Sequence, residues 1–395
     1  MNLRATAEIV AWISAAALFY TYVGYPILLF LLSKLRPRAV RRGEFLPTVS
    51  LIITAYNEER DLHGKLENTL ALDYPRAQLE IIVASDCSTD GTDEIARGFS
   101  SQGVRLIRQP ERLGKTAAQN AAVAAATGEI ILFSDATSLY PADVVRRIMP
   151  SFADVTVGCV SGRLVYVDPA KSRVGEGARS YWGYESFLKT HESRIGSLIG
   201  ASGCLYAVRR SAYVPLYHEA CSDFIIATKM VEQGLRAVYE PHAVCTEETN
   251  RQPGKEMRMR VRIINQTFSD LWRHRAMMNP FRSGFYAVQL WSHKVMRYFV
   301  PFFLAAFLGA TAILAASSIA FRLMFTLQLV GYGLGLLASL LDYAGIRNRT
   351  LAFPQYFLLA NLASVIALYQ FLRGERYARW EPIRDAPAPL QGQRT

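Results

Sequence analysis

A chain of 395 residues is long enough for one large domain or two ordinary ones. Hydrophobic residues make up 51% of it, which is high for a purely soluble protein. The net charge of +11 would suit anionic partners, but no basic stripe interleaved with aromatic residues occurs, so we expect no nucleic-acid partner. Much of the arginine lies beside apolar segments, which points to lipid headgroups and membrane topology.

Four stretches without Asp, Glu, Lys or Arg account for the apolar excess: residues 9–33, 298–321, 323–341 and 350–372. A helix of about 20 apolar residues spans the ~30 Å core of a bilayer, so each stretch is long enough to cross it. The first lacks a small-residue cleavage site, and we interpret it as a retained anchor rather than a signal peptide. The lack of charged residues inside the stretches disfavours a transporter or channel.

Basic residues predict the orientation of the chain. Only Arg4 and Glu8 precede the first stretch, whereas it is followed by Lys34, Arg36, Arg38, Arg41 and Arg42. Positive charge stays on the cytoplasmic side. We therefore expect an integral protein of the cell (inner) membrane whose N-terminus faces out and whose residues from 34 onward face the cytosol. Four crossings would leave the C-terminus outside, although it carries Arg373, Arg376, Arg379 and Arg384. Either one C-terminal stretch does not fully cross, or an interfacial helix upstream enters the membrane.

We therefore expect four parts: a transmembrane anchor at 1–33, a cytosolic domain at 34–280, an interfacial helix with C-terminal transmembrane helices at 281–372, and a basic, partly disordered tail at 373–395. The five cysteines are odd in number and lack CxxC spacing. That usage suits a reducing compartment and argues against a disulfide framework or a zinc site.

The front of the cytosolic part alternates strands and helices. Short apolar runs predict strands at 49–54, 79–85, 104–107 and 129–133, and helical spacing predicts helices at 62–72, 92–100 and 116–126. Such alternation implies an α/β fold with a parallel sheet, in which ligands bind beyond the carboxyl ends of the strands. Those ends carry Tyr56 to Glu58, Asp86 and Asp135. Asp90 and Thr92 also suit a turn and a helix start.

Residues 49–59, 73–75, 85–92 and 133–135, in this order and spacing, resemble the inverting family 2 glycosyltransferases. The resemblance runs from about residue 47 to 264 and implies a GT-A fold, Rossmann-like with a mostly parallel sheet, flanked by transmembrane helices. It also implies transfer of a hexose-type sugar from a nucleotide-diphosphate sugar, with a UDP-sugar expected, to a lipid-linked or polysaccharide acceptor. The alternatives are a processive polysaccharide synthase and a non-catalytic protein that binds a nucleotide sugar.

The resemblance implies a role for each motif on the donor side. The nucleotide sugar would be held by Ala55, Tyr56, Glu58, Asp86, Lys115 and Ser134. Asp135 would bind a divalent cation, Mg²⁺ or Mn²⁺, between the two phosphates. Thr137 stands where the family's Asp-x-Asp element has its second acid, and its hydroxyl would ligate directly or through water. For Lys115 the alternative interpretation is an exposed surface lysine.

The later motifs would act on the acceptor and the leaving group. Asp223 takes the position of the catalytic base, although it would also suit the N-cap of a helix at 224–233. Either Arg260 or Arg262 falls where processive relatives carry a diphosphate-binding arginine, and both would also suit an amphipathic helix lying on anionic lipid. On the acceptor side we expect Trp182, Tyr184 and Gly203, with core packing as the alternative for the two aromatic rings.

Overall fold

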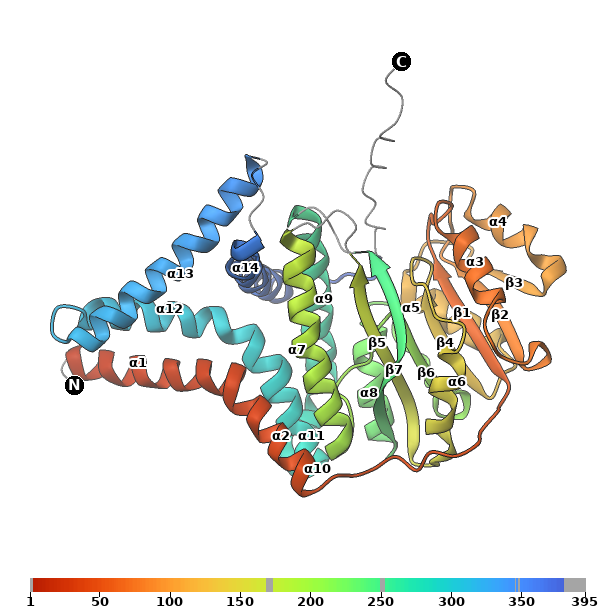
Figure 1. Ribbon diagram of the computed structural model, residues 1–395, viewed down its shortest axis with the longest axis horizontal. Helices are drawn as coiled ribbons and strands as arrows, with labels where there is room; N and C mark the ends of the chain where they lie inside the picture. Colours follow the sequence, from red (N-terminus) through yellow and green to blue (C-terminus); the bar gives the residue numbers. More distant parts are fainter. Residues whose placement is uncertain (1–2, 168–172, 249–252, 345, 347–348, 380–395) are drawn as a thin grey trace, which may run out of the picture.

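The computed structural model describes residues 3–167, 173–248, 253–344, 346 and 349–379. An α/β domain occupies one end of the molecule and long apolar helices occupy the other (Figure 1). Of the tail expected at 373–395, residues 380–395, which include Arg384, lie outside the described residues.

The first half of the domain is a four-stranded parallel sheet. Its strands are β1 (Val49–Ala55), β2 (Leu79–Ser85), β3 (Val104–Arg108) and β4 (Ile130–Asp135), in the order β3-β2-β1-β4. The helices between them are α3 (Leu62–Leu70), α4 (Thr92–Gly98) and α5 (Lys115–Ala125). The predicted alternation is therefore confirmed, because each expected strand and helix is present with ends shifted by at most two residues.

The second half extends the sheet. Its elements are α6 (Val144–Ile148), β5 (Val157–Val167), α7 (Arg173–Ile195), β6 (Leu205–Arg209), α8 (Ser222–Glu232) and β7 (Arg236–Glu248). Strand β6 lies antiparallel between β4 and β5, and β7 pairs with β5 in parallel, so the seven strands run β3-β2-β1-β4-β6-β5-β7. This mixed, mostly parallel sheet confirms the fold class expected from the sequence.

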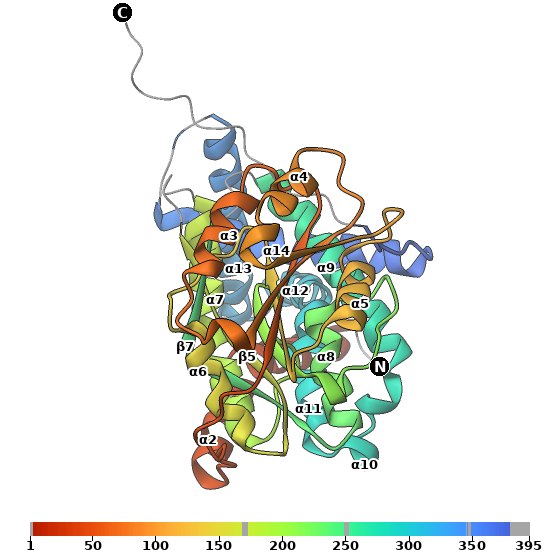
Figure 2. The ribbon, with the colours of Figure 1, turned by 90° about the vertical axis from the view of Figure 1, so that its right-hand side faces the viewer.

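Two apolar layers cover the sheet. Leu66 of α3 and Val145 of α6 pack on one face, and Ala118 of α5 and Ile226 of α8 pack on the other. Neighbouring residues of one strand divide between the layers, because successive side chains of a strand point to opposite faces. Figure 2 shows α5 and α8 on one side of the strands and α3 and α6 on the other.

Four helices in the described part of the chain are long and apolar enough to cross a membrane: Leu3–Leu35, Phe285–Leu314, Ile319–Tyr343 and Ala352–Leu372. The first consists of α1 (Leu3–Phe19) and α2 (Tyr25–Leu35), joined by a π-helical turn. The second comprises α11 (Phe285–Leu290), a second π-helical turn and α12 (Met296–Leu314), preceded by the short α10 (Pro280–Ser283). The last two are α13 (Ile319–Tyr343) and α14 (Ala352–Leu372).

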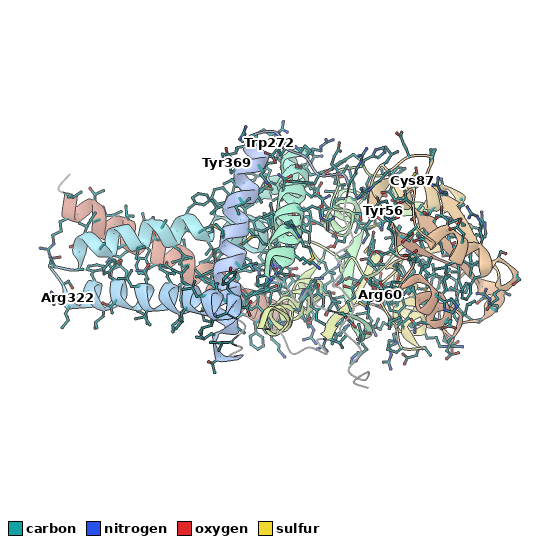
Figure 3. The ribbon with its side chains drawn as sticks, turned by 90° about the horizontal axis from the view of Figure 1, so that it is seen from above. Tyr56, Arg60, Cys87, Trp272, Arg322 and Tyr369 are labelled. Atoms are coloured by element: carbon teal, nitrogen blue, oxygen red, sulfur yellow. The ribbon has the colours of Figure 1, made fainter. Side chains whose placement is uncertain are left out.

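Helix α14 is arranged differently from the other three. Figure 1 shows α1, α12 and α13 extending away from the sheet, with α14 seen end-on, and Figure 3 shows α14 lying across them beside α9 (Pro253–Arg273). Trp272 of α9 and Tyr369 of α14 lie at the same edge in Figure 3, so the two helices run in the same direction. Tyr356, near the start of α14, contacts Arg260, and Phe371, near its end, packs on Phe268. Helix α14 therefore follows α9 along most of its length.

A buried arginine fixes the linker between the membrane anchor and the sheet. The Arg236 side chain, on the first residue of β7, is 3% exposed. Its guanidinium donates to the carbonyl oxygens of Gly196 (2.7 Å), Arg38 (2.8 Å) and Ser193 (3.1 Å). Hydrogen bonds to charged groups are the stronger ones, so this arginine ties the linker, the end of α7 and β7 together.

The Arg236→Met variant should release this linker. Loss of the guanidinium leaves several buried carbonyls without a donor, and we expect the free energy of unfolding to fall by about 3 kcal/mol. Limited trypsin digestion should cut faster after Arg38 and Arg41. Arg210→Met is the matched control because the Arg210 side chain is exposed. Equal cleavage rates in the two variants would contradict the assigned role.

Candidate active site

One cavity of about 320 Å³ gathers residues from across the chain. Seven of the residues predicted from the sequence line it: Lys115, Asp135, Trp182, Gly203, Asp223, Arg260 and Arg262. The other seven are not among its described lining residues: Ala55, Tyr56, Glu58, Asp86, Ser134, Thr137 and Tyr184. The cavity lies where β4 ends and where α5 and α8 begin, as expected for a ligand site in a sheet of this type.

Asp135 and Lys115 form an ion pair in the cavity wall. Asp135 is the last residue of β4, and Lys115 is the first residue of α5. The Lys115 ammonium donates to Asp135 Oδ1, and the lysine side chain is 25% exposed. Burial would lower the pKa of Lys115, but Asp135 raises it above its ordinary value. Lys115 is therefore a charged group of the cavity and not an exposed surface lysine.

Asp86 holds the loop that presents Lys115. It follows the last residue of β2 and is fully buried. Its carboxylate accepts from the backbone N–H groups of Leu113 (2.9 Å) and Gly114 (2.9 and 3.0 Å). Burial raises the pKa of Asp86, while these amide donors oppose the rise. Asp86, the loop, Lys115 and Asp135 thus form a continuous chain of contacts.

The ends of β1 and β2 are conformationally strained. Asn57 and Cys87 have φ values of +53° and +59°, a region that residues other than glycine rarely adopt and that clusters at functional sites. Asn57 Oδ1 accepts from the backbone N–H of Thr89 at 2.7 Å, and Glu58 N–H donates to Thr92 Oγ1 at 2.7 Å. Figure 3 shows Tyr56 and Cys87 near each other on this part of the domain.

Further predicted residues have contacts outside the cavity. Ala55 is buried within β1, and the Tyr56 ring lies 3.8 Å from the guanidinium carbon of Arg112. Ser134 is buried, and its hydroxyl accepts from Tyr140 Oη at 2.6 Å. Thr137 is exposed. Ser134 therefore packs within the sheet, and Thr137 lies apart from the cavity that Asp135 lines.

The Asp223 carboxylate lies against a glycine. Asp223 is the second residue of α8, whose N-cap is Cys221, so the helix cap is a different residue. Its Oδ1 accepts from Phe224 N–H (3.0 Å) and Cys221 Sγ (3.1 Å). A Cβ atom on Gly203 would lie 2.9 Å from Oδ2. Residue 203 must therefore be glycine for the carboxylate to keep this position.

A buried carboxylate supports the loop before Asp223. Asp270 of α9 accepts from Cys221 N–H at 3.1 Å and from the Tyr217 hydroxyl. Burial raises the pKa of Asp270 to about 8. Asp270 was not predicted as a site residue, because nothing in the local pattern of α9 shows that the distant 217–221 loop packs there.

The two candidate arginines of α9 differ in their partners. Arg260 donates to Glu256 Oε1 (2.8 Å) and to the Tyr356 hydroxyl, and its guanidinium lies 4.7 Å from the Tyr181 ring centre. For Arg262, no hydrogen bond or ion pair is found among the described residues, although its side chain lines the cavity. Arg260 is thus held in the packing of α14, and Arg262 is the arginine whose charge is open to a ligand.

The predicted acceptor residues are divided between places. Trp182 lines the cavity and also packs against Tyr166 of the core, with ring centres 6.0 Å apart. Tyr184 instead packs with Tyr25 and Leu29 of α2 and lines a second cavity. Trp182 is therefore part of both the core packing and the cavity wall, and its contact with an acceptor stays a prediction.

Several charged residues of the cavity were missed from the sequence: Glu185, Lys189, Glu192, Glu247 and Lys294. Burial and, after it, the charge of Asp135 raise the pKa of Glu247 to about 7. The sequence signal for Glu185 and Lys189 was their position close to Trp182 and Tyr184, where only the two rings were predicted to contact an acceptor.

The segment after α14 reaches the cavity. Gln266 Nε2 donates to the carbonyl of Tyr377 at 2.7 Å, and Ala378 lines the cavity. The Ala378 carbonyl occupies the space where a side chain on Gly114 would lie, and Gly114 has φ +104°. Residues 374–379, which we call the strap, thus lie directly over the loop that Asp86 holds.

The residues fit a cation that arrives with a diphosphate and not a resident metal. Among the described residues, no group of three or more His, Cys, Asp and Glu side chains could hold an ion. Asp135 offers one carboxylate, and one of its oxygens already accepts from Lys115. Mg²⁺-type ions are commonly held by one or two carboxylates together with substrate phosphates.

Comparison with known proteins agrees with this geometry. Residues 50–214 match the family model described as Glycosyl transferase family 2. An N-acetylglucosaminyltransferase of Mesorhizobium japonicum is 27% identical over 291 residues, which cover 68% of this chain and 68% of that protein. A beta-monoglucosyldiacylglycerol synthase of a Nostoc species is 26% identical over 171 residues, which cover 42% of this chain and 36% of that protein.

A solved structure shares the fold over nearly the whole chain. The mannosyltransferase PcManGT from Pyrobaculum calidifontis, in complex with GDP-Man and Mn²⁺, superposes with a TM-score of 0.71 at 24% identity. The match covers 93% of this chain and 99% of that one. With the matched segment and the sheet order, the comparisons show that this chain carries a glycosyltransferase family 2 domain of the GT-A fold and is a glycosyltransferase.

Proposed function

We propose that the chain transfers a hexose-type sugar, with inversion, from a nucleoside-diphosphate sugar to a lipid-linked or polysaccharide acceptor at the cytosolic face of a membrane. The observation that carries the proposal is the convergence of Asp135, Asp223 and Arg262 in one cavity, although they lie far apart in the chain. Inverting transfer needs a base beside the acceptor hydroxyl and positive charge beside the departing diphosphate. This cavity supplies both.

Asp223 acts as the base. The acceptor oxygen forms a bond to the anomeric carbon while the bond from that carbon to the diphosphate oxygen breaks. The electron pair leaves with the nucleoside diphosphate, and the acceptor proton passes to the Asp223 carboxylate. Both described hydrogen bonds of that carboxylate go to Oδ1, which leaves Oδ2 for the acceptor. No covalent enzyme intermediate is needed.

Lys115 and Arg262 neutralise the departing diphosphate. Arg262 is favoured over Arg260 because Glu256 and Tyr356 already hold Arg260. A guanidinium suits this role because its planar donors match phosphate oxygens. A divalent cation, Mg²⁺ or Mn²⁺, bound by Asp135 and the donor would add positive charge at the phosphates. Thr137 would ligate only through water or after a local movement, since it is exposed outside the cavity.

We propose that the nucleoside end of the donor binds beside Asp86. In this proposal Ala55, Tyr56, Glu58 and Asp86 surround the base and ribose, next to the positive-φ residues Asn57 and Cys87. We expect a UDP-sugar. The structural neighbour was crystallised with GDP-Man, so both bases belong in any donor panel.

We propose that α14 is an interfacial helix that does not cross the membrane. Both of its ends contact α9, at Arg260 and at Phe268. In its most apolar stretch 39% of the residues are buried, against 22%, 22% and 11% for the other three candidate spans. Three crossings then place the C-terminus in the cytosol. That arrangement agrees with Arg373, Arg376 and Arg379 on the cytosolic side and with the strap over Gly114.

The function is tested by donor hydrolysis and sugar transfer with purified full-length protein. Asp223→Asn should lower the rate by about 100-fold or more, since general-base catalysis contributes about that much, while nucleotide binding is retained. Gly203→Ala should also lower the rate, because its Cβ would push against Asp223 Oδ2. Gly183→Ala is the control, with no atom within 4 Å of the added Cβ. Full turnover by Asp223→Asn would exclude it as the base.

Donor binding is tested separately by Mn²⁺ electron paramagnetic resonance. Bound Mn²⁺ should appear only when UDP or GDP is present, because Asp135 alone is too weak a ligand set. Asp135→Asn should lower the affinity for the ion at least about tenfold, which is the size of losing one charge-assisted contact. Arg262→Met should weaken nucleotide binding, whereas Arg260→Met should chiefly lower thermal stability. Tight Mn²⁺ binding without nucleotide would contradict the proposal of a cation carried by the donor.

The topology is tested with intact cells and a membrane-impermeant thiol reagent. A cysteine at Ser317, between α12 and α13, should be labelled from outside. An epitope added after Thr395 should resist external protease until the membrane is broken. Digestion of that epitope in intact cells would show that α14 crosses the bilayer.

A further inference from the structure

A second cavity of about 370 Å³ adjoins the first. It lies between α7, α9, α12, α14 and the bend between α1 and α2, where Tyr22 contributes to its wall. The two cavities share Tyr181, Arg260, Ile264, His293, Lys294 and Tyr298. A molecule in the second cavity therefore reaches the wall of the cavity that contains Asp223.

The second cavity has an apolar side and a cationic side. The apolar side is lined by Phe353, Phe357 and Ala360 of α14, and the Phe353 side chain is 70% exposed on the surface of the molecule. Arg260, Lys294 and Arg297 line the other side, and no Asp or Glu occurs among the described lining residues. A cavity of this kind complements an amphiphile with a negative charge.

The three cations are not equivalent. Arg297 donates to Glu185 and lies 5.2 Å from the Tyr181 ring, and Arg260 donates to Glu256. Lys294 has no carboxylate within 4.0 Å among the residues that the structure places, and its described contact is the Phe224 ring at 5.6 Å. Its ammonium, at the junction of the two cavities, is the charge left for a ligand.

We propose that the second cavity binds the lipid end of a lipid-linked acceptor, with the phosphate that joins lipid and glycan on Lys294 and the hydrocarbon chain leaving past Phe353 and Phe357 into the bilayer. The reacting hydroxyl belongs to the glycan that this phosphate carries, which extends into the first cavity toward Asp223. This assignment rests on the proposed function and narrows it, because it selects an anionic lipid over a neutral lipid or a free glycan. The position of α14 supports it, since a helix lying on the membrane surface sets this cavity at the depth of the lipid headgroups. Lys294 then anchors the acceptor beside the cavity in which Asp223 acts.

The test compares three probes on the full-length protein in detergent: geranylgeranyl monophosphate, geranylgeraniol and inorganic phosphate. Dissociation constants are measured by native mass spectrometry and by ligand-induced thermal shift. The lipid phosphate should bind at least about tenfold more tightly than either of the others, because only it uses both sides of the cavity. Equal binding of the alcohol would overturn the role of Lys294, and equal binding of inorganic phosphate would overturn the role of the apolar side.

Variants separate the two sides of the cavity. Lys294→Gln should remove the preference for the phosphate over the alcohol, and Lys294→Arg should restore it. Ala360→Phe should weaken binding of both lipids by filling the apolar side. Arg322→Gln is the matched control, because Arg322 is an exposed cation at the far tip of the membrane helices (Figure 3). A preference that survives in a folded Lys294→Gln variant would overturn the proposal.

Donor hydrolysis distinguishes this inference from the proposed function. If the wild-type protein hydrolyses a nucleotide sugar but does not prefer the lipid phosphate, the acceptor assignment fails and the glycosyltransferase mechanism stands. If it binds the lipid phosphate but hydrolyses no donor from the panel, the proposed mechanism fails while the cavity assignment stands.

Discussion

Charge buried where the catalytic domain meets the membrane helices must be paired, and this requirement fixes the arrangement of both cavities. Glu185 and Glu192 of α7 are almost fully buried. His293 bridges them, with Nδ1 2.7 Å from Glu192 and Nε2 3.1 Å from Glu185, while Tyr25 donates to Glu192 and Arg297 donates to Glu185. Burial alone would raise the pKa of Glu185, but its cationic partners hold that pKa well below its ordinary value. Breaking such a pair commonly costs about 3–5 kcal/mol, so α2, α7 and α12 keep one relative position.

That network connects the membrane helices to the walls of both cavities. Glu185 and Glu192 line the first cavity, while His293 lines both cavities, so one set of contacts holds the walls of both. Helix α14 adds a second connection, because its first turns line the second cavity. The strap that follows α14 lies over Gly114, in the loop that Asp86 holds. The helix that lines the second cavity is thus continuous in the chain with the strap that covers the loop before Lys115. A soluble domain without these helices would lack one wall of each cavity.

Much of the fold followed from sequence because it rests on local patterns. Apolar runs of β-branched residues placed β1 and β2 nearly to the residue, and parallel strands whose ends share an edge brought Asp135 near Lys115. Convergence with Asp223 needed the resemblance, since β6 inserts antiparallel and no periodicity shows it. The choice between Arg260 and Arg262 could not be made, because it depends on Tyr356, nearly a hundred residues later. Lys294 was not predicted as a site residue, because its position at the junction of two cavities is a property of packing alone.

The threonine at position 137 is consistent with the charge already present around Asp135. Glu247 is half-buried in the same cavity, and desolvation first and Asp135 second raise the pKa of Glu247 to about 7. This end of the cavity therefore disfavours further unpaired negative charge. Lys115 balances Asp135 before any donor binds. An acid at position 137 would add negative charge two residues from Asp135, whereas a hydroxyl adds none. In the proposed mechanism the diphosphate then brings its own cation, and Arg262 is the positive charge that we assign to the leaving group.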